Sequence, residues 1–120
     1  MLTGLGAFTV TTPGTPVAIT TAAVAAVIGG QATYSPRCQS ILFQALSCAA
    51  PQKGAHVNTG RVYIYDRNKV RCATLAVPTT NTIPSFTATL PNTIAGLNAT
   101  HFYIDADNGT DGVDVSILAP

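Results

Sequence analysis

Acidic residues crowd one short stretch near the end of the chain. The segment from Asp105 to Asp114 reads DADNGTDGVD and holds four of the five acidic residues. Carboxylate oxygens at alternating positions around a glycine-containing turn are ligands that a hard cation such as Ca²⁺ prefers. Asp105, Asp107 and Asp111 are therefore candidate calcium ligands. The alternative is a polar, exposed hairpin turn, because the closing acidic residue of an EF-hand loop is missing.

Nucleophilic catalysis has little support. His56 and His101 are the only histidines. Ser47 and Cys48 lie near His56 in the sequence, but without the strand–turn–helix setting of a hydrolase nucleophile. No glycine-rich phosphate loop is present. We expect no enzymatic activity, no catalytic residues, and no cofactor beyond the candidate cation.

The three cysteines, Cys38, Cys48 and Cys72, match no zinc-binding or redox spacing. We expect reduced, mostly buried thiols. One disulfide with a leftover thiol is the alternative.

The elements that must position these side chains read as β-strands. Residues 61–65, 101–106 and 113–117 alternate apolar with polar or aromatic side chains, as half-buried strands do. Asn108-Gly109 is a strong signal for a hairpin between the last two runs. Further strands are expected at 8–12, 17–20, 39–46, 72–75 and 85–90, punctuated by Pro and Gly. The sequence thus predicts an all-β, single-domain antiparallel sandwich or jelly-roll-like barrel, with about eight short strands and an extended N-terminal segment.

Charge is scarce and unevenly distributed. Charged residues make up 9% of the chain, against about 25% in an average soluble domain, while Thr occurs 18 times. Residues 1–36 carry no charge, and all six cations lie between residues 37 and 71. The apolar content excludes disorder, and a net charge of +1 disfavours a nucleic-acid binder. A nearly neutral surface offers little protection against association, so we expect part of it to be covered by a partner.

Residues 17–30 form the longest weakly polar run. Its 14 residues fall short of the roughly 20 that a bilayer span needs, and no Lys or Arg precedes it. The sequence therefore predicts neither a membrane segment nor a signal peptide, and synthesis in the cytoplasm.

The stretch 61–71 carries four cations with Tyr63 and Tyr65 between them. Such surfaces can bind single-stranded nucleic acid. A solvated hairpin or a protein-contact patch is favoured here, because the cations surround a turn at Asp66 and resemble a hairpin tip. With Tyr103, the same tyrosines could instead form a stacking platform for sugars.

Several motifs follow one another in a recognisable order. From Cys38 the chain reads CQSILFQA, then Asn58-Thr-Gly60 leads into VYIY, and the end holds YIDAD and GVDVSI. This order resembles the small β-sandwich virion proteins of tailed bacteriophages. The resemblance implies a capsid decoration (cement) protein on the virion surface, which binds the assembled head and thereby stabilises it. Its partners would be the major capsid protein and copies of itself, commonly as a homotrimer. A tail or head-fibre accessory protein and a carbohydrate-binding β-sandwich module are the alternatives.

The neutral segment 1–18 is the expected contact region, followed by the sandwich domain at 19–120. Under this hypothesis, removal of residues 1–12 would abolish binding to the particle and leave the domain folded. The segment could equally be a buried edge of its own domain. The expected contact residues are Leu2, Leu5, Phe8, Val10, Arg61, Arg67 and Lys69.

Overall fold

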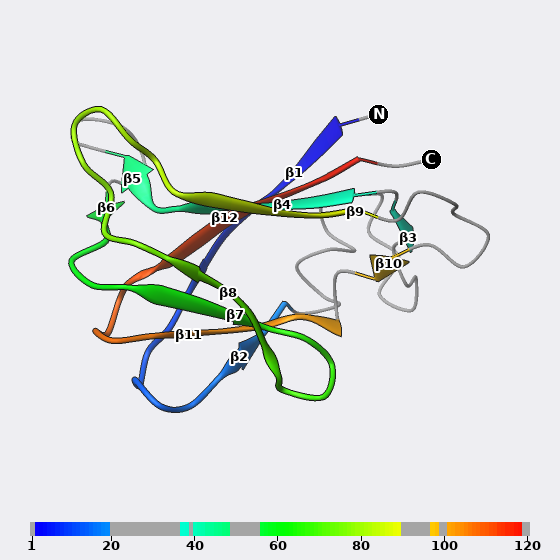
Figure 1. Ribbon diagram of the computed structural model, residues 1–120, viewed down its shortest axis with the longest axis horizontal. Coiled ribbons are helices and arrows are strands. Elements are labelled where there is room, and N and C mark those ends of the chain that lie inside the picture. The colour runs from blue at the N-terminus through cyan, green and yellow to red at the C-terminus, as the bar shows by residue number, and fades with distance from the viewer. Residues whose placement is uncertain are drawn as a thin grey trace.

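The computed structural model describes residues 2–19, 37–38, 40–48, 56–89, 97–98 and 101–118 (Figure 1). The regular structure of these residues is β, which confirms the predicted all-β class. Within the same ranges, no helix is long and apolar enough to cross a membrane.

Two four-stranded antiparallel sheets form the sandwich. The first sheet has the order β1–β12–β4–β9, with bounds Leu2–Thr9, Gly112–Leu118, Ser40–Ala45 and Ser85–Thr89. The second sheet has the order β2–β11–β7–β8, with bounds Val17–Ala18, Tyr103–Ala106, Val62–Tyr65 and Arg71–Leu75. Two short ribbons pair β10 with β3 and β5 with β6, with bounds Leu97–Asn98, Arg37–Cys38, Ser47–Cys48 and His56–Val57.

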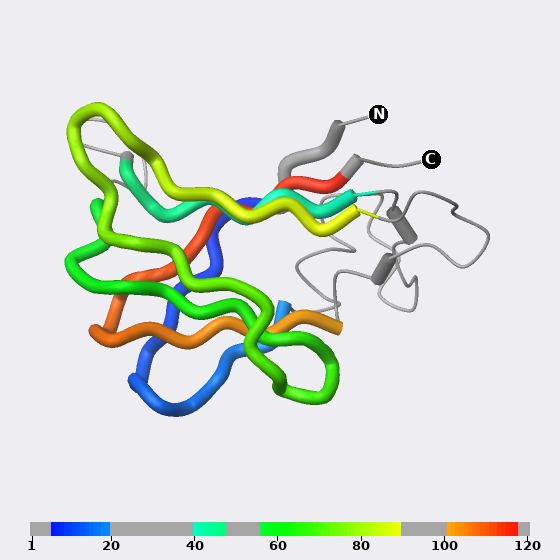
Figure 2. The backbone as a smooth tube through the Cα atoms, viewed as in Figure 1, coloured from blue at the N-terminus to red at the C-terminus, as the bar shows by residue number. Residues whose placement is uncertain are grey.

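Strands that are far apart in the sequence pair in a nested order. β1 pairs with β12, β2 with β11, β3 with β10 and β4 with β9, while β7 and β8 form the tip. The chain is thus one long hairpin folded over on itself, with its blue and red ends side by side (Figure 2). When only the eight sandwich strands are counted from 1 to 8 along the chain, the order is 1-8-3-6 in the first sheet and 2-7-4-5 in the second. This is the order of a jelly roll, so the predicted architecture is confirmed.

The core lies between the two sheets and follows the period of two along each strand. In β4, Ile41, Phe43 and Ala45 face inward, as the alternation predicted. The Phe43 ring is central, with centroid distances of 6.2 Å to Phe86 and 5.4 Å to Phe102. Phe86 comes from the same sheet, and Phe102 immediately precedes β11 of the second, so these rings join the two layers.

The N-terminal segment is an edge of the sandwich. The predicted strand at 8–12 instead runs from Leu2 to Thr9, because β12 supplies a pairing partner along that whole stretch. The exposed fractions of Phe8 and Val10 are 8% and 0%, and both side chains belong to the core. The prediction that these two residues contact another chain is therefore wrong. Leu2 and Leu5 lie in β1, but their side chains fall outside the described part of the structure.

Candidate interaction surface

A buried carboxylate organises the end of the sandwich where the connection between β11 and β12 meets the turn before β7. The predicted hairpin at Asn108-Gly109 is wrong, because β11 and β12 belong to different sheets and the connection crosses from one to the other. Asp111 is fully buried and accepts hydrogen bonds from His56 Nε2 at 2.9 Å and from the Gly60 amide at 2.8 Å. The Thr59 amide also donates to it, at 3.1 Å from each oxygen. Burial by itself would raise the pKa of Asp111, but the hydrogen bonds from His56, Thr59 and Gly60 outweigh it and hold that pKa below its usual value.

The buried side chain of Asn58 completes this junction. Its Nδ2 donates to the Gly112 carbonyl at 2.9 Å, and its Oδ1 accepts from the Gly112 amide at 3.0 Å. A Cβ atom at position 112 would collide with the backbone carbonyl of Phe8, so only glycine fits there. The Asn-Thr-Gly turn is thereby fixed to the start of β12, and this positions the strand that follows it, β7.

The three candidate calcium ligands accept hydrogen bonds from three different sets of donors. Asp105 accepts hydrogen bonds from the amides of Gly14 and Ala106, at 3.0 and 2.8 Å. Asp107 accepts from the Tyr63 hydroxyl at 2.7 Å and from Arg61 Nε at 3.3 Å, while Asp111 serves the junction above. Among the described residues, no group of three or more His, Cys, Asp or Glu side chains could hold a metal ion. The structure therefore does not bring the three carboxylates together as a ligand set.

Tyrosines and cations gather on the outer face of the second sheet. We call this surface the Tyr–cation face, and it consists of Arg61, Tyr63, Tyr65, Lys69, Arg71 and Tyr103. In the register of the sheet, Tyr65 lies between Tyr103 of β11 and Arg71 of β8. The burial pattern of β7 turns Val62 and Ile64 into the core, so the tyrosines of this strand point outward.

Cations lie over two of the three rings. The Arg71 guanidinium is 5.3 Å from the Tyr63 centroid, and Lys69 Nζ is 5.4 Å from the Tyr103 centroid. Arg61 approaches Tyr63 from 6.0 Å. These are cation–π distances, and they hold long cationic side chains over the sheet. The hydrogen bond from the Tyr63 hydroxyl lowers the pKa of Asp107, and the same bond raises the pKa of Tyr63.

Most cations of this face lack a carboxylate partner. All five aspartates lie in described residues, yet the only Lys or Arg ion pair within those residues joins Arg61 to Asp107. Asp66 instead accepts hydrogen bonds from the amides of Asn68 and Val70 and so shapes the turn before β8. Lys69 occupies this turn with a φ of 60°. As a result, the turn and β8 present unneutralised positive charge to solvent.

The predicted contact cations divide into two kinds. Arg61 is exposed but pairs with Asp107, while Arg67 and Lys69 are exposed in the turn without a carboxylate partner among the described residues. Arg71 was not among the predicted contact residues, because only the register of β8 shows that it faces Tyr65. Cys72, in the same strand, is free and exposed, so the expectation of a buried thiol is wrong there.

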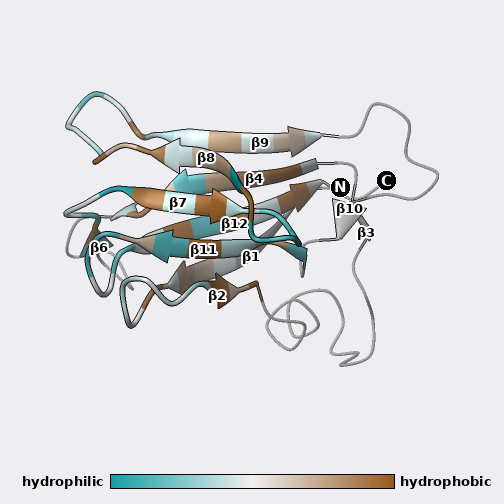
Figure 3. Cartoon of the chain, turned by 60° about the horizontal axis from the view of Figure 1, so that its bottom comes forward, coloured by the Kyte–Doolittle hydropathy of each residue, from teal (hydrophilic) through white to brown (hydrophobic). Residues whose placement is uncertain are grey.

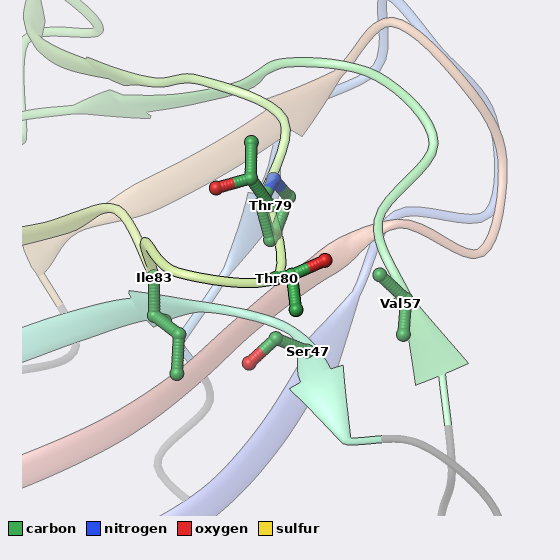
Figure 4. Close-up of a pocket in the computed structure, with 6 residues that line it drawn as sticks. Ser47, Val57, Thr79, Thr80 and Ile83 are labelled. Atoms are coloured by element: carbon green, nitrogen blue, oxygen red, sulfur yellow. The ribbon is translucent and has the colours of Figure 1, made fainter.

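A hollow of about 530 Å³ lies at the end of the sandwich that holds β5 and β6 (Figure 4). Its lining comes from these two strands and from the connection between β8 and β9: Ser47, Val57, Pro78, Thr79, Thr80 and Ile83. None of these side chains is charged or titrates near neutral pH. The hollow therefore offers hydroxyl groups and apolar surface, but no group for acid–base chemistry.

No family model, curated protein or solved structure matches the chain. Its class is accordingly defined by its fold, a small eight-stranded jelly roll with a Tyr–cation face on one sheet.

Proposed function

We propose that this protein is a structural subunit that acts by binding an assembled protein surface, most specifically as a decoration protein on the head of a tailed bacteriophage. Jelly rolls occur in viral capsid proteins and in lectins, so the fold is compatible with this role without deciding it. The order of motifs that resembles phage virion proteins adds support.

The Tyr–cation face is the observation that carries the proposal. Protein interfaces are enriched in Tyr and Arg, and their strongest contacts are often such side chains. Here Tyr65 lies between Arg71 and Tyr103 in a row across three neighbouring strands. Because Lys69 and Arg71 have no carboxylate partner among the described residues, an acidic patch on the partner would complement them.

A subunit of this kind works by mass action. A protein that binds the assembled shell, and not its separated subunits, shifts the equilibrium toward the shell. Many copies on one particle add their contributions even where each contact is modest.

Co-sedimentation with heads of the phage that encodes the chain tests this proposal. We expect the wild-type protein to sediment with heads, and the Arg71→Ala and Tyr65→Ala variants to bind at least tenfold more weakly. Thr9→Ala, an exposed change on the first sheet, is the matched control and should bind normally. Equal binding by all four proteins would exclude this face as the contact, and no binding by any would exclude the decoration role. Co-sedimentation with isolated tails, and not with heads, would favour the alternative role as a tail accessory protein.

A carbohydrate-binding module is a second candidate, favoured by the three tyrosines on one sheet face. Cations lie over Tyr63 and Tyr103, so Tyr65 is the ring on which a sugar would stack. A glycan array distinguishes the two functions, because retention of the wild type and loss with Tyr65→Ala would support the module.

A further inference from the structure

The four edge strands of the sandwich differ in how they are protected from other chains. An edge strand exposes unpaired N–H and C=O groups, and native proteins block them with bulges, charges, prolines or very short strands. β1 shifts register between Gly4 and Gly6. β2 is two residues long and follows Pro16. β8 begins at the charged Arg71, and its pairing with β7 also shifts register.

Among the described residues, β9 is the least protected of the four, although it too follows a proline, Pro84. Its five residues, SFTAT, contain no charge, proline or glycine, and they pair with β4 without a register shift. Figure 3 shows β9 as the outermost strand at the top of the view, consistent with its position at the end of the first sheet. Of the four edges, β9 is the one best suited to accept another strand.

The hydrogen bonds to β4 show which groups of β9 point outward. The Ala45 amide donates to the Pro84 carbonyl at 2.9 Å. Because residues in an antiparallel ladder face the partner strand alternately, Phe86 and Ala88 also bond to β4. Ser85, Thr87 and Thr89 therefore direct their N–H and C=O groups toward the open edge.

The sequence of β9 is complementary to itself in the antiparallel direction. With a two-fold axis at Thr87, the outward groups of Thr87 meet those of its symmetry mate, and Ser85 meets Thr89. Every such pair presents hydroxyl side chains on one face and carries no charge, so no repulsion opposes the pairing. On the inner face the bulky Phe86 would lie opposite the small Ala88, and both are only half-buried in the single chain.

We infer that β9 pairs with β9 of a second copy of this chain, so that two first sheets join into one continuous sheet across a two-fold axis. Ile83 supports this arrangement, since its side chain is 51% exposed just before the strand and would lie next to the new interface. The inference concerns self-association and does not depend on the decoration role.

The mass of the full chain in solution, measured by sedimentation equilibrium over a wide range of concentration, tests this inference. We expect a reversible dimer. Thr87→Pro removes an outward N–H that β4 does not use, and edge strands tolerate such a proline. It should raise the dimer dissociation constant roughly 4- to 100-fold, because two symmetry-related hydrogen bonds are lost and each contributes a factor of roughly 2 to 10. Thr87→Ala keeps the N–H and is the matched control.

A second pair of variants tests the same interface in case Thr87→Pro does not fold. Thr87→Lys places two like charges at the axis and should weaken the dimer more at low salt than at high salt. Thr9→Lys adds the same charge at the opposite edge of the sheet and should leave the dimer unchanged. A monomer at every concentration, the homotrimer expected of a decoration protein, or a dimer insensitive to both Thr87→Pro and Thr87→Lys would overturn the inference. A trimer would overturn it while leaving the proposed function standing.

Discussion

The side chain of Asn58 forms a closed pair of hydrogen bonds with the backbone of Gly112, across 54 positions of sequence. The pair is buried, and it fixes the turn before β7 to the first residue of β12. The neighbouring Asp111 anchors the other two residues of the same turn, Thr59 and Gly60. The first and second sheets are thus joined at this end by polar contacts as well as by the core.

Asn58→Ala should lower the free energy of unfolding by about 1–3 kcal/mol, because it leaves the buried Gly112 amide without an acceptor. The Gly112 carbonyl loses one donor but still accepts a hydrogen bond from the Leu46 amide at 3.2 Å. Urea denaturation followed by circular dichroism would measure this loss of stability. Asn68→Ala, in the exposed turn before β8, is the control and should change stability by no more than about 0.5 kcal/mol. An equal effect of the two changes would show that the Asn58 pair is not structural.

Gly112→Ala should be more damaging than Gly109→Ala. An added Cβ at position 112 collides with the backbone of Phe8, whereas at position 109 the nearest atom is the Thr11 carbonyl oxygen at 3.2 Å. Thermal unfolding of the two variants would compare them. Comparable melting temperatures would contradict the close approach of β1 and β12 at Gly112.

Asp111 should make the protein sensitive to acid. Its folded-state pKa is lowered, so its contribution is complete above the unfolded-state value of about 3.9 and is lost as the pH falls through the folded-state pKa. Asp111→Asn should cost stability at pH 7 and flatten the acid side of the stability profile. The pKa of Asp107 is also lowered, by its hydrogen bond from Tyr63, but Asp107 is exposed, so Asp107→Asn should change the profile in the same direction and by less. An unchanged profile in Asp111→Asn would contradict the role of this carboxylate.

The ionised Asp114 side chain should lower stability at neutral pH, in contrast to that of Asp111. Asp114 is half-buried on the outer face of the first sheet, and burial raises its pKa. A raised carboxyl pKa means that stability falls as the pH rises from the unfolded-state value through the folded-state value. Asp114→Asn should therefore resist urea better than the wild type at pH 7 and equally well at pH 3. Lower stability of the variant at pH 7 would show that the carboxylate has a favourable partner.

Removal of residues 1–12 should unfold the domain. The deletion takes away β1 and the buried Phe8 and Val10, and loss of large core side chains costs about 2–5 kcal/mol each. Near-ultraviolet circular dichroism and proteolysis would detect the collapse of packing. A truncated chain that stays folded and loses only its binding would restore the contact-arm hypothesis.

The fold was accessible from sequence because its signals are local. Alternation in residues 40–45, 62–65 and 113–117 placed the inward faces correctly, and Pro and Gly separated the strands. The extent of β1 was missed, since a glycine-containing stretch becomes a strand only where β12 pairs with it. The acidic segment suggested one hairpin and one cluster of ligands. In the structure its two strands lie in different sheets, and Asp105, Asp107 and Asp111 accept hydrogen bonds from different donors. The Asn58-Thr-Gly60 turn, together with an aspartate in the glycine-containing connection before the last strand, was the signal that could have indicated the Asp111 junction.

The pairing of Leu2 with Leu118 brings the two ends of the described chain side by side. Any domain fused to either end would emerge at the same place, so both fusions would sit alike on the molecule. A short linker between these ends would also allow new termini to be opened at the tip of the hairpin, in the turn at Asn68. Such a circular permutant would keep every pair of neighbouring strands. Its refolding rate would show whether folding of the wild type must begin with the pairing of β7 and β8.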